Sequence, residues 1–203
     1  MSEALPPELA SSKIIYRGRV FNVTVDAVAH PDGRLVNIEV VRHRGSVVLL
    51  PMAAPDRILL VRQYRYVVGK WLWELPAGTR EPNERLDAAA LRECYEEVGK
   101  IAGRAEKLLS FFPSPGFCDE EMHFFLLTDL RDRRPGEAAP HQDPDEILSV
   151  TEFSVKEVRE MVRAGAICDI ARVLVPADSA RGKAGLAPFW ERLGRSNSKL
   201  IHA

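Results

Sequence analysis

Short runs of apolar and β-branched residues, separated by turn residues, dominate the first third of the chain and predict β-strands. Segment 30–34 (HPDGR) has the composition of a hairpin turn, and segment 53–56 (AAPD) that of a second turn. The strands expected from this pattern cover residues 14–16, 20–28, 35–42, 46–51, 57–66 and 71–75.

A helical periodicity then replaces the strand pattern up to Gly99. Apolar side chains recur there at the spacing of one helical stripe, which predicts a helix packed against a core. These residues are Leu91, Cys94, Tyr95 and Val98. Asp87 in the first turn suits the helix dipole and Gly99 is a natural stop, whereas Arg85 is a poor N-cap.

Strands dominate again after the glycine. We expect strands over 105–112 and 122–128 around the loop 113–117, a polar, proline-rich segment over 132–145, a strand over 147–153, a helix over 155–164 and a last helical region at about 168–174. Strands, helix, strands and helix in this order predict an α+β sandwich rather than a parallel doubly wound sheet.

Size and charge narrow the class of protein. With 203 residues, 46% of them hydrophobic and 28% charged, we expect one domain with an accessory segment. The net charge of −1, with acids and bases interspersed, predicts neither a nucleic-acid groove nor a basic membrane patch. No apolar run approaches the ~18 residues of a membrane span, and the first residues lack the pattern of a secretory signal. We therefore expect a cytoplasmic protein without a membrane partner.

The cysteines predict no cross-link. There are three of them, Cys94, Cys118 and Cys168, without a C-x-x-C spacing, so neither a disulfide framework nor a zinc site is expected. Cys94 belongs to the apolar helical stripe, where a small buried hydrophobe is the ordinary interpretation. A reducing compartment fits this usage, and no cysteine is expected to act as a nucleophile.

One motif spans the turn into the predicted helix: residues 78–99 read G-x5-E-x7-R-E-x-x-E-E-x-G. Its seven fixed positions make a chance match unlikely. Glu93, Glu96 and Glu97 are three or four residues apart or adjacent, so they point to neighbouring faces opposite the apolar stripe. Clustered glutamates on a helix are usually a solvated face, but as metal ligands their hard oxygens suit Mg2+ or Mn2+.

The motif resembles the Nudix box, the signature of hydrolases that cut nucleoside diphosphates linked to another moiety. The resemblance implies that Glu93 and Glu97 are the principal ligands of Mg2+, for which Mn2+ can substitute. It also implies that Glu96 lies close by and that the backbone carbonyl of Ala77 completes the metal site.

Other box residues have a structural role by the same resemblance. They are Gly78, Glu84, Arg92 and Gly99, with a charge-assisted hydrogen bond between Glu84 and Arg92 that joins the loop to the helix. Lys100 departs from the pattern, because the residue after the last glycine is usually apolar. Its aliphatic stem is expected to lie along an edge of the core.

Flanking features narrow the resemblance to the ADP-ribose pyrophosphatase branch. They are YRGRVFNV with VVRHRGSVVLLP, the pair VRQYR and WELPAG, and Pro115 of SPGF, sixteen residues beyond Gly99. The fold implied is the Nudix fold, a mixed sheet sandwiched between helices, with an added N-terminal antiparallel β-domain. We place the N-terminal β-segment at 1–45 and the hydrolase domain at 46–203, with the box at 78–100.

The branch also implies a homodimer in which the N-terminal segments are exchanged across a two-fold axis. Tyr16, Phe21 and Arg42 would then act at the substrate of the other subunit. Phe21 or Tyr16 is a candidate to stack on adenine, although an aromatic residue in a strand is more often part of the core.

Further substrate-binding candidates flank the box. Arg65 is the candidate clamp for the diphosphate, because guanidinium binds phosphate through paired hydrogen bonds, with an exposed strand arginine as the alternative. Glu74 is a candidate polar contact for the nucleotide, and Pro115 is the candidate from the SPGF loop. Trp73 is expected to pack in the core.

The general base is expected on the loop before the last strand. The stretch DEILSV resembles the family's D-E-x-x-E-V, which favours Glu146 over its neighbours Asp143 and Asp145. A loop carboxylate has the freedom to reach the attacking water once substrate is bound. Glu96 is the alternative base within the box.

These features predict Mg2+-dependent hydrolysis of the pyrophosphate bond of ADP-ribose to AMP and ribose 5-phosphate. A Nudix hydrolase of another nucleotide sugar, such as GDP-mannose or an ADP-sugar, is the alternative, because a base-stacking slot tolerates different bases. A non-catalytic ADP-ribose sensor is a remote alternative. It would show altered box glutamates or an added DNA-binding helix pair, and the sequence has neither.

Overall fold

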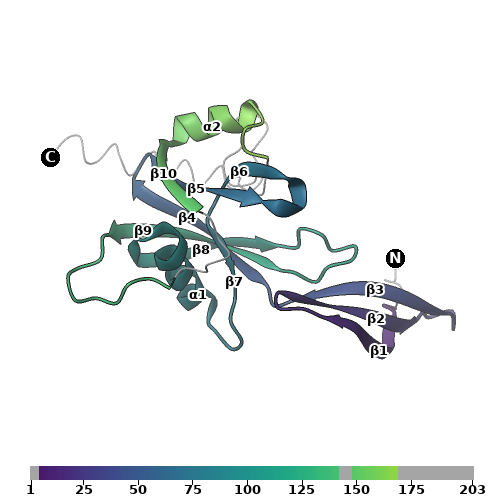
Figure 1. The fold of residues 1–203 in the computed structure, drawn as a ribbon. Helices are drawn as coiled ribbons and strands as arrows, with labels where there is room; N and C mark the ends of the chain where they lie inside the picture. The colour runs from purple at the N-terminus through teal and green to yellow at the C-terminus, as the bar shows by residue number, and fades with distance from the viewer. Residues whose placement is uncertain (1–4, 142–147, 169–203) are drawn as a thin grey trace.

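The first three strands form a sheet of their own. The computed structural model describes residues 5–141 and 148–168, beginning with β1 (Glu8–Arg17), β2 (Phe21–Ala29) and β3 (Leu35–His43), an antiparallel sheet with β2 in the middle. The expected turn joins β2 to β3, where Gly33 at φ 83° donates its N–H to the carbonyl of His30 at 2.9 Å. This sheet projects away from the rest of the molecule (Figure 1).

A larger mixed sheet forms the body of the protein. Its strands are β4 (Ser46–Ala54), β5 (Arg57–Arg65), β6 (Lys70–Glu74), β7 (Ala77–Thr79), β8 (Ile101–Phe111), β9 (Met122–Arg131) and β10 (Leu148–Ser154). The main path runs β10-β5-β4-β9-β8, with β6 paired to β5 and β7 paired to β4. The β4–β9 pair is parallel and the other pairs are antiparallel, so the mixed sheet of the sequence prediction is confirmed.

Two helical units cover opposite faces of this sheet (Figure 1). Helix α1 (Leu86–Glu93) continues as the π-helical segment η2 (Cys94–Val98), which ends at Gly99 with φ 71°. Helix α2 (Val155–Arg163) starts with a capping box, in which Ser154 Oγ accepts from the Glu157 N–H at 3.1 Å and the Ser154 N–H donates to Glu157 Oε2 at 2.7 Å. A short 3₁₀ turn, η1 (Tyr66–Val68), joins β5 to β6.

The core has two layers because successive strand residues face opposite sides. On β4, Val47 and Leu49 pack towards α1, whereas Val48 and Leu50 pack towards α2. Trp73, expected to pack in the core, is partly buried and meets the ring of Phe153 edge to face at 5.0 Å between centroids. The two layers account for the sandwich predicted from the order of elements.

The WELPAG segment is divided between two strands, of which the sequence predicted only the first, at 71–75. The chain leaves β6 after Glu74, where it pairs with β5, and enters β7 at Ala77, where it pairs with β4. Pro76 stands at this crossing; it has no N–H to donate to a ladder, and its carbonyl accepts from the Leu49 N–H at 2.8 Å. The division directs Ala77 and Gly78 away from the β5–β6 hairpin.

The expected apolar stripe of the box helix is also wrong in part. Cys94 and Val98 are buried, but Leu91 is 37% exposed and Tyr95 is only half-buried. The helix instead buries Ala89 and Ala90 against the sheet. The small alanine side chains bring this face of the helix close to β4, and Leu91 lies outside it.

The last helical region expected at about 168–174 lies outside the described residues, apart from Cys168. Among the helices that the described residues form, none combines the length and the apolar character needed to span a bilayer.

Candidate active site

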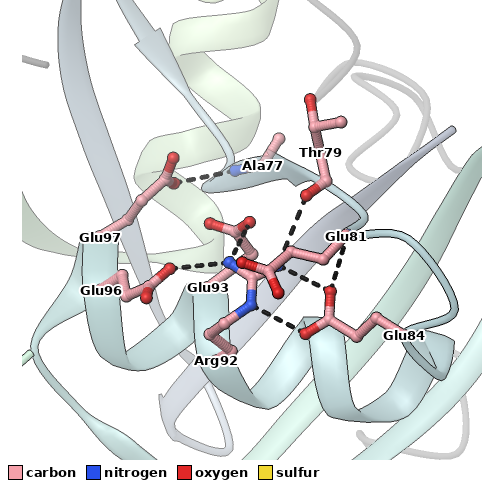
Figure 2. A network of polar contacts seen from close by, with 8 residues as sticks. All are labelled: Ala77, Thr79, Glu81, Glu84, Arg92, Glu93, Glu96 and Glu97. Carbon is pink, nitrogen blue, oxygen red and sulfur yellow. Dashed lines mark hydrogen bonds and ion pairs between the residues drawn. The ribbon is translucent and has the colours of Figure 1, made fainter. Parts of the chain in front are cut away.

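The turn at Gly78 and the helix at Glu93 meet at one point of closest approach. A Cβ atom on Gly78 would overlap the carboxylate of Glu93, so any other residue here would displace that carboxylate. On the next turn of the helix, Glu97 Oε2 accepts the N–H of Ala77 at 2.9 Å. Glu93 and Glu97 therefore lie directly against the backbone of β7 (Figure 2).

Arg92 lies at the centre of the carboxylates (Figure 2). Its Nε and Nη2 donate to the two oxygens of Glu84, each at 2.8 Å, while Nη1 donates to Glu93 at 2.7 Å and to Glu96 at 2.8 Å. The pair expected from the sequence, Glu84 and Arg92, is thus formed as a fork-to-fork contact. Its hydrogen bonds lower the pKa of Glu84 and raise that of Arg92.

Glu93 and Glu97 are buried, at 7% and 8% exposure, against the backbone of β7, whereas Cys94 and Val98 pack in the core of the sheet. The burial of the two glutamates shows that this side of the helix is not a solvated face. Buried carboxylates are costly unless they are compensated by partners or by a cation. Glu96, with its side chain 23% exposed, lies towards the outer side of the helix.

The donor set suits a hard divalent cation. Carboxylate oxygens of Glu93 and Glu97, beside the backbone at Ala77, are the ligand type that Mg2+ or Mn2+ prefers. In the part of the chain that the structure describes, no group of three or more Asp, Glu, His or Cys side chains is already arranged to hold a metal ion. Glu93 and Glu96 contact Arg92 instead, and Glu97 contacts the Ala77 N–H.

A second polar group lies on the β5–β6 hairpin. Two sequence candidates meet here: Arg65 Nε donates to both oxygens of Glu74 at 3.0 Å, and its Nη2 donates to Oε2 at 2.5 Å. Glu74 is only 5% exposed, whereas the Arg65 side chain is 44% exposed. A buried carboxylate thus holds a partly exposed arginine side chain in one orientation.

Sequence reasoning missed Gln63, two positions before Arg65 on the same face of β5 and 9% exposed. Alternation along the strand is the signal that could have found it, because residues two apart share a face. Gln63 pairs in register with Leu148 of β10. Glu146, Asp143 and Asp145, the candidate bases, precede Leu148 in the chain and lie outside the described residues.

A third group gathers where β3 meets the loop between β8 and β9. Arg42 forms ion pairs with Asp26 and with Asp119, the latter at 3.0 Å. The loop carries the exposed Pro115, and the Val41 N–H donates to the Phe117 carbonyl at 2.7 Å. The structure thereby joins the SPGF loop to the N-terminal sheet.

Phe21 and Tyr16 are 41% and 54% exposed, with ring centroids 6.1 Å apart. Their place in a core, the alternative considered from the sequence, is therefore wrong for the single chain.

Cys94 is a buried thiol rather than a reactive one. Burial, aided by the charge of Glu97, raises its pKa to about 12. All three cysteines are free, as expected from their number and spacing. Lys100 donates to Asp132 at 2.5 Å, so its charge is held at the end of β9.

A glutamate-bearing helix packed on a glycine turn, at the edge of a mixed sheet between two helical layers, defines the class of protein. Residues 42–169 match the model of the NUDIX domain. The chain belongs to the NUDIX family.

Individual relatives cover most of the chain. The chain is 31% identical to an ADP-ribose pyrophosphatase of Bacillus subtilis, over 82% of this chain and 89% of that protein. It is 36% identical to an ADP-ribose pyrophosphatase of Mycobacterium tuberculosis, over 79% and 76%. It is also 33% identical to a methanol dehydrogenase activator of Bacillus methanolicus, over 86% and 92%.

A solved structure described as an ADP compounds hydrolase shares the fold. It superposes with a TM-score of 0.64 at 18% identity, over 100% of this chain and 99% of that one.

Proposed function

We propose that this protein hydrolyses the pyrophosphate bond of ADP-ribose, with Mg2+, to AMP and ribose 5-phosphate. The observation that carries the proposal is that Glu93 packs against Gly78 and Glu97 accepts the Ala77 N–H. Two buried carboxylates therefore lie at one backbone turn. The substrate is proposed from the relatives named ADP-ribose pyrophosphatase. Water adds across the bridge, so that one P–O bond forms to the incoming oxygen and one breaks to the leaving phosphate.

The box residues divide the work of holding a divalent cation. A bound Mg2+ neutralises the diphosphate oxygens and lowers the pKa of water. Glu93 and Glu97, with the Ala77 carbonyl and Glu96 nearby, are the residues proposed to hold it. Arg92 keeps the carboxylates at this turn through Glu84, Glu93 and Glu96.

The substrate candidates provide the complementary charge. Arg65 is proposed to bind the diphosphate, since Glu74 fixes its orientation and its side chain is 44% exposed. Phe21 is proposed to stack on adenine, and its exposure supports a role outside the core of its own chain. Arg42 and Pro115 are proposed to border the same substrate.

Glu146 is proposed as the general base. The support comes from chain connectivity: Leu148, two residues further on, pairs with Gln63, on the strand that ends in Arg65. Glu146→Gln should lower kcat more than KM, because a base acts in the transition state. A rise in KM alone would instead favour Asp143, Asp145 or Glu96.

We propose that the active form is a homodimer and that residues 1–45 form the exchanged segment. The three-stranded sheet exposes apolar side chains of all its strands, among them Leu9, Ile14, Ile15, Leu35, Val36 and Ile38. A small sheet without a covering layer is marginal in water, and a second copy would bury it. Light scattering that shows an active monomer would refute the dimer.

Subunit mixing tests whether the site is shared. At ADP-ribose concentrations well below KM, neither Arg42→Ala homodimers, whose KM is raised, nor Glu97→Gln homodimers should turn over well, but mixed dimers should recover part of the activity if Arg42 acts across the interface. No recovery in the mixture would place Arg42 in its own subunit's site.

A substrate panel tests the reaction itself. Turnover with Mg2+ is measured on ADP-ribose, ADP-glucose, GDP-mannose, a diadenosine polyphosphate, NADH and FAD. We expect kcat/KM for ADP-ribose to exceed the others about tenfold or more, a difference of ~1.4 kcal/mol in transition-state binding. Preference for GDP-mannose or ADP-glucose would keep the box chemistry and overturn the substrate. No turnover on any of them, with retained ADP-ribose binding, would favour a sensor.

A further inference from the structure

The loop between β8 and β9 (residues 112–121) lies along the end of β3 and is called the strap below. Asp119 makes its main contacts with β3. The Asp119 N–H donates to the Val41 carbonyl at 3.1 Å. Its Oδ1 accepts from the His43 N–H at 2.7 Å, and its Oδ2 accepts from Arg42 Nη1 at 3.0 Å. One residue of the strap therefore binds three consecutive residues of β3.

The far side of Arg42 is held from within the N-terminal sheet. Arg42 Nη2 donates to Asp26, which is 4% exposed and also accepts from Ser12 Oγ at 2.6 Å. The guanidinium thus bridges two carboxylates that lie on different parts of the fold. Its two amino groups are fixed by partners, so the arginine is oriented before any substrate arrives.

The same junction reaches the box loop. Two residues after His43, the Gly45 carbonyl accepts the Arg80 N–H at 3.1 Å, and Arg80 follows directly on β7. On the other side, the Ser46 N–H donates to the Glu121 carbonyl at 3.1 Å. The end of β3, the strap and the box loop are therefore connected by hydrogen bonds within a few residues.

We propose that Asp119 is a positioning residue, which holds Arg42 and the Pro115 loop as one unit for substrate binding. The inference rests on the proposed hydrolase function. Two carboxylates flank Arg42, and their negative charges outweigh its positive charge. Arg42 on its own therefore attracts a diphosphate only weakly. The contribution of Arg42 to substrate binding then depends on Asp119, so the effects of the two residues are not additive.

A double-mutant cycle tests this dependence. KM and kcat for ADP-ribose are measured for Asp119→Ala, Arg42→Ala and the double variant, all with Mg2+. We expect each single variant to raise KM about tenfold with kcat within about twofold, and the double variant to be no worse than either single one. Asp119→Asn, which keeps the acceptor for the His43 N–H, should raise KM less than Asp119→Ala does.

Asp32 provides a matched control. On the exposed β2–β3 turn it accepts the Arg34 N–H at 3.1 Å and Arg34 Nε at 2.6 Å, which copies the Asp119 contacts with a backbone and a guanidinium. Asp32→Ala should leave KM unchanged. An unchanged KM in both Asp119 variants, a fall in kcat alone, or KM increases that multiply in the double variant would each overturn the proposal.

The substrate proposal and the positioning proposal fail separately. If the wild-type protein prefers another nucleotide sugar, the same cycle is measured with that sugar, and only the choice of ADP-ribose is lost. If Asp119→Ala does not fold, the KM of Asp119→Asn decides the matter in the same way.

Discussion

The carboxylate of Glu93 occupies the space that a Cβ atom of Gly78 would need. Gly78→Ala should therefore displace the Glu93 carboxylate. We expect kcat/KM to fall about 100-fold, since a misplaced group near the reacting atoms lowers the rate by about that factor. Steady-state kinetics with Mg2+ measure this. Gly33→Ala is the control, because its positive φ of 83° strains the backbone at a remote turn without any atom near the new Cβ. A Gly78→Ala enzyme with wild-type kinetics would contradict the role given to the close contact between Gly78 and Glu93.

Glu97→Gln should abolish most turnover while the fold is kept. The amide keeps the size of the side chain and an oxygen for the Ala77 N–H, but it removes the charge that a divalent cation requires. Loss of several kcal/mol of transition-state stabilisation predicts a fall in kcat of about 100-fold or more. Mn2+ binding, followed by electron paramagnetic resonance, should weaken in parallel. The exposed Glu160→Gln on α2 serves as the control, and a loss of only two- to threefold in Glu97→Gln would mean that the metal site is misassigned.

The contact between Glu84 and Arg92 predicts a dependence of stability on acid pH. Arg92 lowers the pKa of Glu84 below its ordinary 4.5 in the folded protein, so the contact stabilises the fold fully above about pH 4.5. That stability is lost as the pH falls through the lower, folded pKa. In Glu84→Gln the free energy of unfolding should be about 1–2 kcal/mol smaller at pH 7, with a weaker fall below pH 4.5. Urea unfolding from pH 3 to pH 7 measures both the difference in free energy at pH 7 and its fall in acid. If the free energy of unfolding fell in parallel in variant and wild type, the contact would not be the cause of the acid dependence.

Arg65→Lys should raise KM for ADP-ribose about tenfold and largely keep kcat, because lysine has the charge but not the paired donors. The neighbouring Arg62 offers a matched control on the opposite face of β5, where it stacks 5.3 Å from the ring centroid of Trp71. Arg62→Lys should have the KM of the wild type. A wild-type KM in Arg65→Lys would show that Arg65 acts only through its charge.

Cys94 should resist alkylation in the folded protein. Its thiol is buried with a pKa of about 12, whereas Cys168 is exposed. Iodoacetamide at pH 8, followed by mass spectrometry of peptides, should label Cys168 first and Cys94 only after denaturation. Labelling of Cys94 at the rate of Cys168 would show that the helix leaves its place on the sheet.

Much of the candidate site could be predicted because its residues are close in sequence. Glu84 and Arg92 are eight residues apart, and a turn followed by a helix brings them together whatever the rest of the fold does. The helix stop at Gly99 and the burial of Cys94 likewise follow from local chemistry. The burial of Glu93 and Glu97 could not be predicted, since periodicity alone assigns charged residues to the solvent side.

Contacts between distant segments needed the tertiary structure. The pairing of Arg65 with Glu74 depends on the β5–β6 hairpin, and that of Arg42 with Asp119 spans 77 positions of the chain. Neither strand alternation nor composition contains such information, because many registers satisfy the same apolar pattern.

By itself, the sequence determined the class of chemistry, the order of strands and helices, and the residues of the box. Those features arise from local spacing, backbone preference and the oxygen ligands that a divalent cation requires. The tertiary structure decided that Gly78 yields its space to Glu93, that Pro76 divides β6 from β7, and that Asp119 attaches the loop to β3. These are consequences of close packing, in which a backbone from one part of the chain limits the side chains of another.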